Sequence, residues 1–245
     1  MIFDTYAFSS HGGRPYNEDS AGYQTEGDHG IFVVADGLGG HSFGELASAH
    51  VRDALLDGFP CQDGDPAQWL ASQVSIANQG VLALQREKNA LMKSTAVVLY
   101  IMGNRAVWAH VGDSRLYYVH EGRIKACTED HSVAYKKYKA GEITKREIAF
   151  DEDQPRLLRA IGGEDHSEPV IRVYEELLSP GDGFFLCTDG AWEFLDDEEI
   201  AIDLLKSSHA RQWTEYLLMR MMDRIKPGND NLTALSVILN YDKTY

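Results

Sequence analysis

Residues 96–127 read AVVLYIMGNRAVWAHVGDSRLYYVHEGRIKAC. The stretch divides into four short segments rich in β-branched, aromatic and aliphatic residues, at 96–102, 105–111, 116–120 and 123–127. Turn-forming pairs separate them, namely Gly103-Asn104, Gly112-Asp113 and Glu121-Gly122. Strand-like segments joined by such short turns are typical of antiparallel hairpins. The pattern predicts an antiparallel meander of four strands.

Outside this stretch, strand patterns alternate with helix patterns. Residues 31–35 (IFVVA) form a continuous apolar run that is typical of a strand buried on both faces. Helices are predicted from residue 44 to 57 and from Asp65-Pro66 onward, where Asp can cap and Pro suits the first turn. The remaining predictions are strands at 170–177, 183–188 and 232–241, helices at 197–207 and 210–225, and a polar flap at 132–159 with one or two short helices. This order predicts one α+β domain over residues 1–245, with packed antiparallel sheets and helices outside.

Composition excludes several classes of partner and location. Acidic residues outnumber basic ones 38 to 23, which gives a net charge of −15 that repels nucleic acid and anionic membranes. The cysteines, Cys61, Cys127 and Cys187, form no CxxC pair, so a disulfide framework and a cysteine zinc site are disfavoured. The first residues lack a secretion signal, and the longest apolar run, 96–102, is too short to cross a bilayer. We therefore expect a cytoplasmic protein.

Acidic residues recur at predicted strand ends, beside Gly or Asn. They lie in Asn17-Glu18-Asp19, Asp36-Gly37, Gly112-Asp113, Asp189-Gly190 and Asp230-Asn231. A strand end mounts a carboxylate rigidly, and oxygen ligands of this kind suit Mg²⁺ and Mn²⁺. A single Asp-Gly pair can equally be a hairpin turn. Asp36 fits that alternative least, because it follows five apolar residues and precedes a loop longer than a hairpin needs.

Other catalytic motifs are incomplete or absent. Gly39 and Gly44 have P-loop spacing, but Glu45 stands where the phosphate-binding lysine is required. Ser42 replaces the third glycine of a dinucleotide fingerprint. The sequence contains no HExxH and no GxSxG. A Ser-His-Asp triad stays open, although no residue points to one.

Seven segments, in order, resemble the protein phosphatase 2C family, the metal-dependent protein phosphatases. They are 14–19 (RPYNED), 32–40 (FVVADGLGG), 44–48 (GELAS), 111–115 (VGDSR), 128–132 (TEDHS), 181–182 with 186–190 (GD, LCTDG) and 230–233 (DNLT). The resemblance runs from about residue 7 to the end, as in a compact bacterial-type catalytic domain. It implies a β-sandwich flanked by antiparallel helix pairs.

The resemblance also implies a role for each matching residue. Asp36 matches the carboxylate that bridges two cations, Mn²⁺ or Mg²⁺, and Gly37 matches the carbonyl ligand of the second. Asp189 and Asp230 match the other carboxylates of the first cation. Glu18 and Asp19 match second-cation ligands that bind directly or through water, and which of them binds directly is left open. Asp113 matches a ligand of an optional third cation, for which Glu147, Asp151 and Asp153 are candidate flap partners.

Arg14 matches the arginine that grips the substrate phosphate; the alternative is a surface arginine paired with Glu18 or Asp19. Leu38 stands where animal members carry a histidine proposed as general acid. Protonation of the leaving oxygen then falls to a metal-bound water or to His41, while His131 is expected to secure a loop.

The implied reaction is hydrolysis of phosphoserine and phosphothreonine by water activated between two cations about 4 Å apart, without a phospho-enzyme. Its partners would be phosphoproteins and a cognate Ser/Thr kinase. Two alternatives stay open: a small-molecule phosphatase that uses the same cations, and a non-catalytic module on the same fold.

Overall fold

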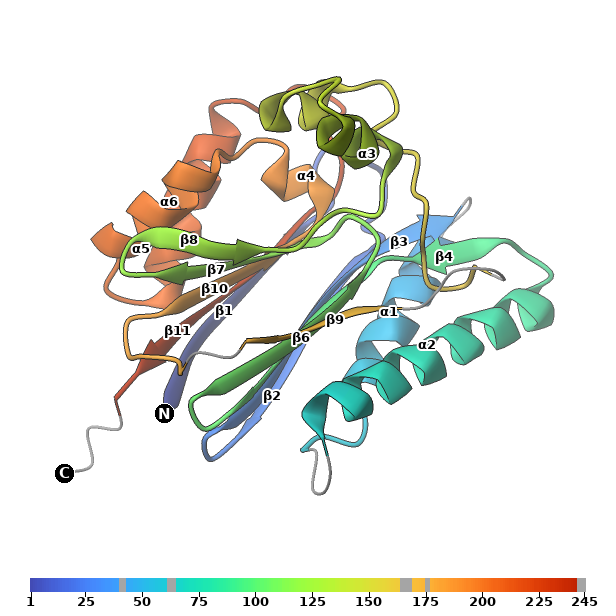
Figure 1. Ribbon diagram of the computed structural model, residues 1–245. Coiled ribbons are helices and arrows are strands. Elements are labelled where there is room, and N and C mark those ends of the chain that lie inside the picture. The colour runs from blue at the N-terminus through green and yellow to red at the C-terminus, as the bar shows by residue number, and fades with distance from the viewer. Residues whose placement is uncertain (40–42, 61–64, 164–168, 175–176, 242–245) are drawn as a thin grey trace.

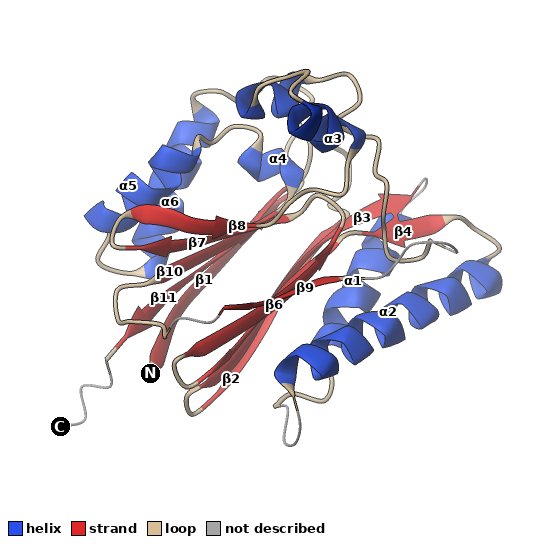
Figure 2. Ribbon diagram, viewed as in Figure 1, coloured by secondary structure: helices blue, strands red, loops and turns tan. Residues whose placement is uncertain are grey.

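The computed structural model describes residues 1–39, 43–60, 65–163, 169–174 and 177–241, which form two antiparallel sheets packed face to face (Figures 1 and 2). The first sheet has the order β1-β11-β10-β7-β8. Its strands are β1 (Ile2–Ser10), β11 (Leu232–Asn240), β10 (Gly183–Cys187), β7 (Arg115–His120) and β8 (Arg123–Cys127). The second has the order β2-β3-β5-β6-β9, with β4 paired to β3. Its strands are β2 (Asp19–Glu26), β3 (His29–Gly39), β4 (Met92–Ser94), β5 (Ala96–Met102), β6 (Arg105–Val111) and β9 (Val170–Tyr174).

Helix pairs cover the outer faces of the sandwich (Figure 2). The helices α1 (Phe43–Leu56) and α2 (Pro66–Lys88) lie over the second sheet, and α5 (Asp197–Lys206) and α6 (Ala210–Met222) lie over the first. Asp65 caps α2 by accepting a hydrogen bond from the Ala67 amide at 3.1 Å, with Pro66 in the first turn, as the sequence predicts. The predicted α+β sandwich is confirmed. No described helix is long and apolar enough to span a membrane.

The core between the sheets is built by alternate residues of the strands. Phe32, Val34 and Leu99 of the second sheet and Leu186 and Leu235 of the first are all fully buried there. The neighbours that alternate with them in β3, such as Ile31 and Val33, pack against α1 and α2 instead. Residues 31–35 are therefore buried on both faces, as predicted.

The predicted four-strand meander is wrong in one connection. Hairpin β5–β6 belongs to the second sheet and hairpin β7–β8 to the first, so β6 and β7 do not pair. The chain crosses between sheets at Gly112-Asp113-Ser114, where Gly112 has φ +100°. A local turn signal cannot show whether two strands continue in one sheet, because that depends on which distant strands cover their faces.

One strand and one strand boundary also differ from the sequence prediction. No strand is predicted at β2, because its outer half is exposed and carries the polar sequence Tyr23-Gln24-Thr25-Glu26, which has no apolar run. β3 continues past Asp36 to Gly39, since β4 provides a new partner for it. The flap holds two short helices, α3 (Val133–Ala140) and the 3₁₀ helix η1 (Lys145–Phe150), as expected.

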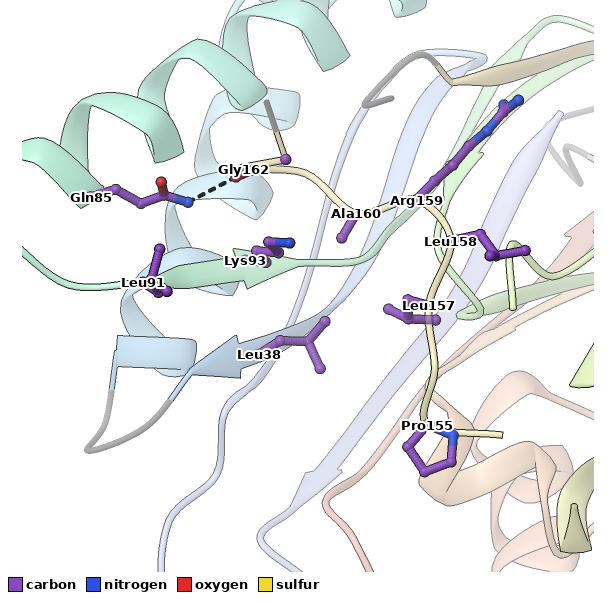
Figure 3. Close-up of a pocket in the computed structure, with 11 residues that line it drawn as sticks. Leu38, Gln85, Leu91, Lys93, Pro155, Leu157, Leu158, Arg159, Ala160 and Gly162 are labelled. Atoms are coloured by element: carbon purple, nitrogen blue, oxygen red, sulfur yellow. Dashed lines mark hydrogen bonds between the residues drawn. The ribbon is translucent and has the colours of Figure 1, made fainter. Parts of the chain in front are cut away.

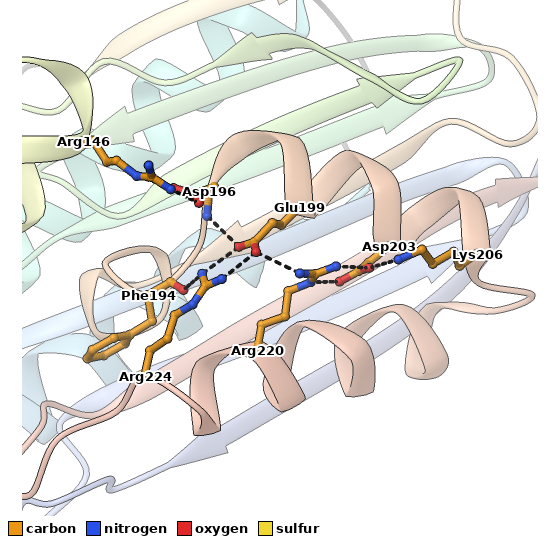
Figure 4. A network of polar contacts seen from close by, with 8 residues as sticks. All are labelled: Arg146, Phe194, Asp196, Glu199, Asp203, Lys206, Arg220 and Arg224. Atoms are coloured by element: carbon orange, nitrogen blue, oxygen red, sulfur yellow. Dashed lines mark hydrogen bonds and ion pairs between the residues drawn. The ribbon is translucent and has the colours of Figure 1, made fainter.

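An ion-pair network ties α5 to α6 (Figure 4). The Glu199 carboxylate accepts hydrogen bonds from Arg224 at 2.6 and 2.7 Å and from Arg220 at 2.8 Å. Arg146 of η1 pairs with Asp196, the N-cap of α5, so the flap is joined to the same network. The helix pair and the flap are thus held together by charge as well as by packing.

Candidate metal centre

Asp36 lies where β3 exchanges one neighbouring strand for another. β3 pairs with β5 as far as Val34 and with β4 from Gly37 onward. Between them, the Asp36 amide donates to Thr95 Oγ1 at 2.9 Å, and its carbonyl accepts from the Thr95 amide at 2.8 Å and Ser94 Oγ at 2.9 Å. The backbone of Asp36 is therefore fixed on both sides, which gives its carboxylate a rigid mount.

Four further aspartates act on the Asp36 carboxyl electrostatically. Burial raises the pKa of Asp36 well above its ordinary value, and the charges of Asp189, Asp19, Asp113 and Asp230 raise it further. These residues come from four other strand ends and are far apart in the sequence. Folding therefore gathers the predicted acidic residues at one edge of the sandwich.

Asp189 and Asp230 are each oriented by two hydrogen bonds. Asp189 opens the short helix α4 (Asp189–Trp192); its Oδ1 accepts from the Gly190 amide at 2.7 Å and its Oδ2 from Gln154 Nε2 at 3.2 Å. Asp230 lies two residues before the start of β11; its Oδ1 accepts from the Asn231 amide and its Oδ2 from Arg14 Nη2, both at 2.8 Å. Each side chain is thus held in one orientation before any cation is bound.

Asp19 and Glu18 occupy different surroundings at the start of β2. Asp19 is 8% exposed and its Oδ2 accepts from Thr188 Oγ1 at 2.9 Å. Burial, with the charges of Asp189 and Asp230, raises the Asp19 pKa to about 7. Burial also raises the pKa of Glu18. Its carboxylate lies instead at the start of α1, beside Gly44.

Gly37 and Gly44 allow a close approach of backbone and carboxylate oxygens. A Cβ at position 44 would lie 2.7 Å from both Gly37 O and Glu18 Oε1, and a Cβ at position 37 would lie 2.0 Å from Gly44 O. Side chains at these positions would therefore collide with the backbone or with Glu18. Their absence leaves the Gly37 carbonyl and the Glu18 carboxylate next to each other.

Arg14 lies at the same edge, half exposed, and forms an ion pair with Asp230. The partner is neither of the two carboxylates, Glu18 or Asp19, considered from the sequence. An arginine at this place can present its planar fork of N–H donors to an anion that enters from solvent.

Asp113 joins the cluster, but the flap carboxylates have other partners. Burial and the charge of Asp189 raise the pKa of Asp113 well above its usual range. Lys137 Nζ contacts Asp151 Oδ1 at 2.8 Å and Asp153 Oδ2 at 2.7 Å. Glu147 accepts from the Thr144 amide at 2.7 Å and so caps η1. All three flap candidates therefore already have structural partners.

The two histidines considered from the sequence are placed differently. His41 lies outside the described residues. His131 stacks on His110 with ring centroids 4.7 Å apart, and its Nδ1 accepts from the Gly112 amide at 3.2 Å. Burial, with the charges of His110 and Arg159, lowers the His131 pKa to about 3. Neutral and hydrogen-bonded, His131 secures the chain where it crosses between the sheets.

The donor set fits hard divalent cations. It consists of carboxylate and carbonyl oxygens, and several of its carboxyl pKa values are raised by burial and then by the like charge of neighbouring aspartates. Within the described ranges, no three His, Cys, Asp or Glu side chains are already gathered as in a filled metal site. Carboxylates repel one another, and cations such as Mg²⁺ also use carbonyls and water, so such gathering is not required of the side chains alone.

A sequence model described as Protein phosphatase 2C matches residues 10–234. The chain belongs to the protein phosphatase 2C family. The match covers the carboxylates Asp19, Asp36, Asp113, Asp189 and Asp230. It confirms the family inferred from the seven motifs.

Relatives within the protein phosphatase 2C family carry the same activity in their names. The chain is 30% identical over 235 residues to "Serine/threonine phosphatase stp" of Listeria welshimeri, covering 93% of this chain and 92% of that one. It is similar to the solved serine/threonine phosphatase of S. agalactiae, with a TM-score of 0.85 and 26% identity over 98% of this chain and 100% of that one. This protein phosphatase 2C member is a protein serine/threonine phosphatase.

A second solved structure connects the fold to metal. The catalytic domain of the serine/threonine phosphatase PstP, in complex with two manganese ions, has a TM-score of 0.82 and 28% identity, covering 98% of this chain and 99% of that one. Divalent cations therefore belong to this fold in a protein phosphatase 2C relative.

Sequence reasoning missed the residues that support the aspartates. Thr188 precedes Asp189 within a family motif, which was a usable signal. Gln154 had none, since it lies in a polar flap segment and reaches Asp189 only through the fold. Trp192 donates from Nε1 to the Asp113 carbonyl at 2.9 Å, and its position was equally unreadable.

Proposed function

We propose that this edge of the sandwich is a two-cation centre that hydrolyses phosphoserine and phosphothreonine in proteins. The proposal is carried by the convergence on Asp36 of aspartates from other strand ends: Asp19 faces it in the β2–β3 ladder, and three further aspartates act on it through their charges. Buried like charges are unfavourable unless a cation neutralises them. Support also comes from the two manganese ions of the PstP relative.

The cations would be Mn²⁺ or Mg²⁺, held by Asp36, Asp189, Asp230 and the Gly37 carbonyl. Glu18 lies beside that carbonyl and would share its cation, whereas Asp19, with one oxygen bonded to Thr188, would act through water. Asp113 would hold an optional third cation. Bound there, two divalent cations acidify water and offset charge on phosphoryl oxygens.

The chain's own side chains position the substrate. Arg14 would exchange its contact with Asp230 for two oxygens of the phosphate, which its planar guanidinium can bind as a fork. Gln154, Gly190 and Asn231 keep the two neighbouring aspartates oriented meanwhile. Leu38 carries no transferable proton, so the proton for the leaving oxygen would come from water or from His41.

We further propose that residues 1–245 form one catalytic domain and that its activity opposes a Ser/Thr kinase. The first supporting observation is the pairing of β1 with β11 across the whole chain length. The second is chemical, because hydrolysis of a phosphoserine or phosphothreonine ester reverses the product of such a kinase. The cytoplasmic location stays a prediction.

The test measures phosphate release from a phosphothreonine peptide and from p-nitrophenyl phosphate, with Mn²⁺ or with a chelator. We expect release from both substrates with Mn²⁺ and none with the chelator. Asp36→Asn should lose at least about 10³-fold in kcat, whereas Asp57→Asn, an exposed aspartate elsewhere, should keep wild-type turnover. Turnover that persists in Asp36→Asn would overturn the proposed centre, and faster release from metabolite phosphates than from any peptide would overturn the substrate class.

A further inference from the structure

A groove of about 650 Å³, shown in Figure 3, is lined in part by Leu38, two residues after Asp36 in β3. Its floor includes Leu38 of β3 and Lys93 of β4, and its far wall includes Leu157 and Leu158, from the segment that follows the flap helices. The volume is within the range of ligand sites in proteins. None of these four residues has a role in the centre described above.

The groove and the centre share one strand pair. Leu38 follows Asp36 by two residues and is paired in register with Lys93. The next residue of β4, Ser94, donates its hydroxyl hydrogen bond to the Asp36 carbonyl at 2.9 Å. A ligand whose phosphate reaches Asp36 can therefore continue along the same ribbon into the groove.

The walls of the groove are tied together. Gln85 of α2 donates from Nε2 to the Met92 carbonyl at 2.6 Å and to the Gly162 carbonyl at 2.8 Å, as Figure 3 shows for the second bond. Ser94 and Ile161 exchange backbone hydrogen bonds at 3.0 and 2.8 Å. Helix α2, β4 and the segment that follows the flap thus form a single support, so little ordering is needed when a ligand binds.

The lining combines exposed apolar side chains with a cation. Leu38, Leu91 and Leu158 are 36%, 83% and 38% exposed, and all three line this groove. Lys93 lies exposed among them. Arg159 also lines the groove, but Figure 3 shows its side chain directed away from Leu38 and Lys93. The surface therefore favours a ligand with an apolar group and a negative charge.

We propose that this groove binds the polypeptide of the phosphoprotein substrate next to the phosphorylated residue, and that it favours a leucine-sized side chain together with a carboxylate. This inference rests on the function proposed above. A polypeptide suits the site because the groove extends the ribbon that carries Asp36. A small phosphate ester would occupy the centre without reaching Leu91. Leu38 then acts as the first apolar contact of the substrate chain.

The experiment compares kcat/KM, with Mn²⁺, for three kinds of substrate. The first is p-nitrophenyl phosphate, and the second is an alanine-based phosphothreonine peptide. The third is a set of peptides of the same length in which Leu and Glu, or Leu and Lys, are placed in turn at the three positions on either side of the phosphothreonine. The proteins are wild type, Leu91→Ser and Lys93→Glu. Leu205→Ser and Lys125→Glu serve as matched controls, because both are exposed residues on the other sheet or its helices.

We expect the best Leu- and Glu-containing peptide to exceed the alanine peptide by about tenfold in wild type. Leu91→Ser should lower the ratio of peptide to p-nitrophenyl phosphate kcat/KM by about five- to tenfold, mainly through KM. Lys93→Glu should reverse the preference from Glu to Lys. The two control variants should leave the ratio at its wild-type value.

The docking groove is overturned if the ratio in both groove variants matches that of the controls, or if both substrates lose activity in parallel. The proposed function fails separately, when wild type with Mn²⁺ releases phosphate from neither p-nitrophenyl phosphate nor any peptide.

Discussion

Asp19 and Asp36 stand directly opposite each other in the β2–β3 ladder. Like charges at such paired positions destabilise a sheet. Both carboxyl pKa values are raised, that of Asp19 to about 7, chiefly by burial and then by neighbouring aspartates. The fold therefore keeps a repulsive pair in its second sheet that a bound cation would relieve.

This pair predicts opposite effects of Asp36→Asn on stability and on metal response. Without metal, and at a pH above the raised pKa values of both carboxyls, the variant should unfold about 2–5 °C above wild type, because one of two facing charges is removed. With Mn²⁺, wild type should gain several degrees while the variant gains little, since its ligand set is broken. Thermal unfolding of both proteins, with chelator and with Mn²⁺, measures this. A variant that is less stable than wild type in chelator would contradict it.

Gln154 should tune metal affinity through Asp189. Gln154→Met keeps the length of the side chain but removes the hydrogen bond to Asp189 Oδ2. Supporting hydrogen bonds of this kind are typically worth 10- to 100-fold in metal affinity, so we expect the Mn²⁺ concentration for half-maximal activity to rise by about tenfold. Glu152→Gln, its exposed neighbour, is the control. Equal Mn²⁺ requirements in the two variants would show that Gln154 only packs the flap.

Arg14 should contribute through its planar fork. Arg14→Ala is expected to lower kcat/KM on p-nitrophenyl phosphate by about 10²-fold, and Arg14→Lys should recover less than about a tenth of the loss, because a lysine acts as a point charge. Mn²⁺ binding, measured by calorimetry, should not weaken in either variant, since Asp230 only loses a competing cation. Full recovery of activity by lysine would show that charge alone matters.

Glu199 should make stability depend on acid pH. Hydrogen bonds from Arg224, followed by the Asp196 amide and Arg220, lower its folded-state pKa to about 2, from 4.5. Because the pKa is depressed on folding, its contribution is complete above about pH 4.5 and is lost as pH falls towards 2.

We therefore expect Glu199→Gln to cost about 2 kcal/mol at pH 7 and clearly less at pH 3.5, by denaturant unfolding. Glu215→Gln removes an exposed ion pair with Arg211 and should cost less than about 0.5 kcal/mol at either pH. An equal loss at both pH values in Glu199→Gln would assign its effect to packing.

Local patterns in the sequence were sufficient for most elements and for the choice of site residues. Short apolar segments bounded by turn-forming pairs located β5 and β6, and Asp65-Pro66 located the start of α2, because turn formation and helix capping depend on neighbouring residues only. The aspartates were found through family motifs and strand ends, and their ligand roles stay predictions. The exposed, polar half of β2 carries no such pattern and was missed.

Only the tertiary structure decided which segments meet. The same Gly112-Asp113 turn signal would serve a hairpin or a crossing between sheets, and burial of β6 and β7 against different distant strands selects the crossing. The same holds for the pairing of Asp19 with Asp36 and for the hydrogen bond from Gln154 to Asp189. Each contact joins residues that are separated in the sequence, and the residues around them carry no local signal of it. Sequence patterns determine what each segment can form, whereas pairing follows from the burial of whole faces, which is a property of the complete chain.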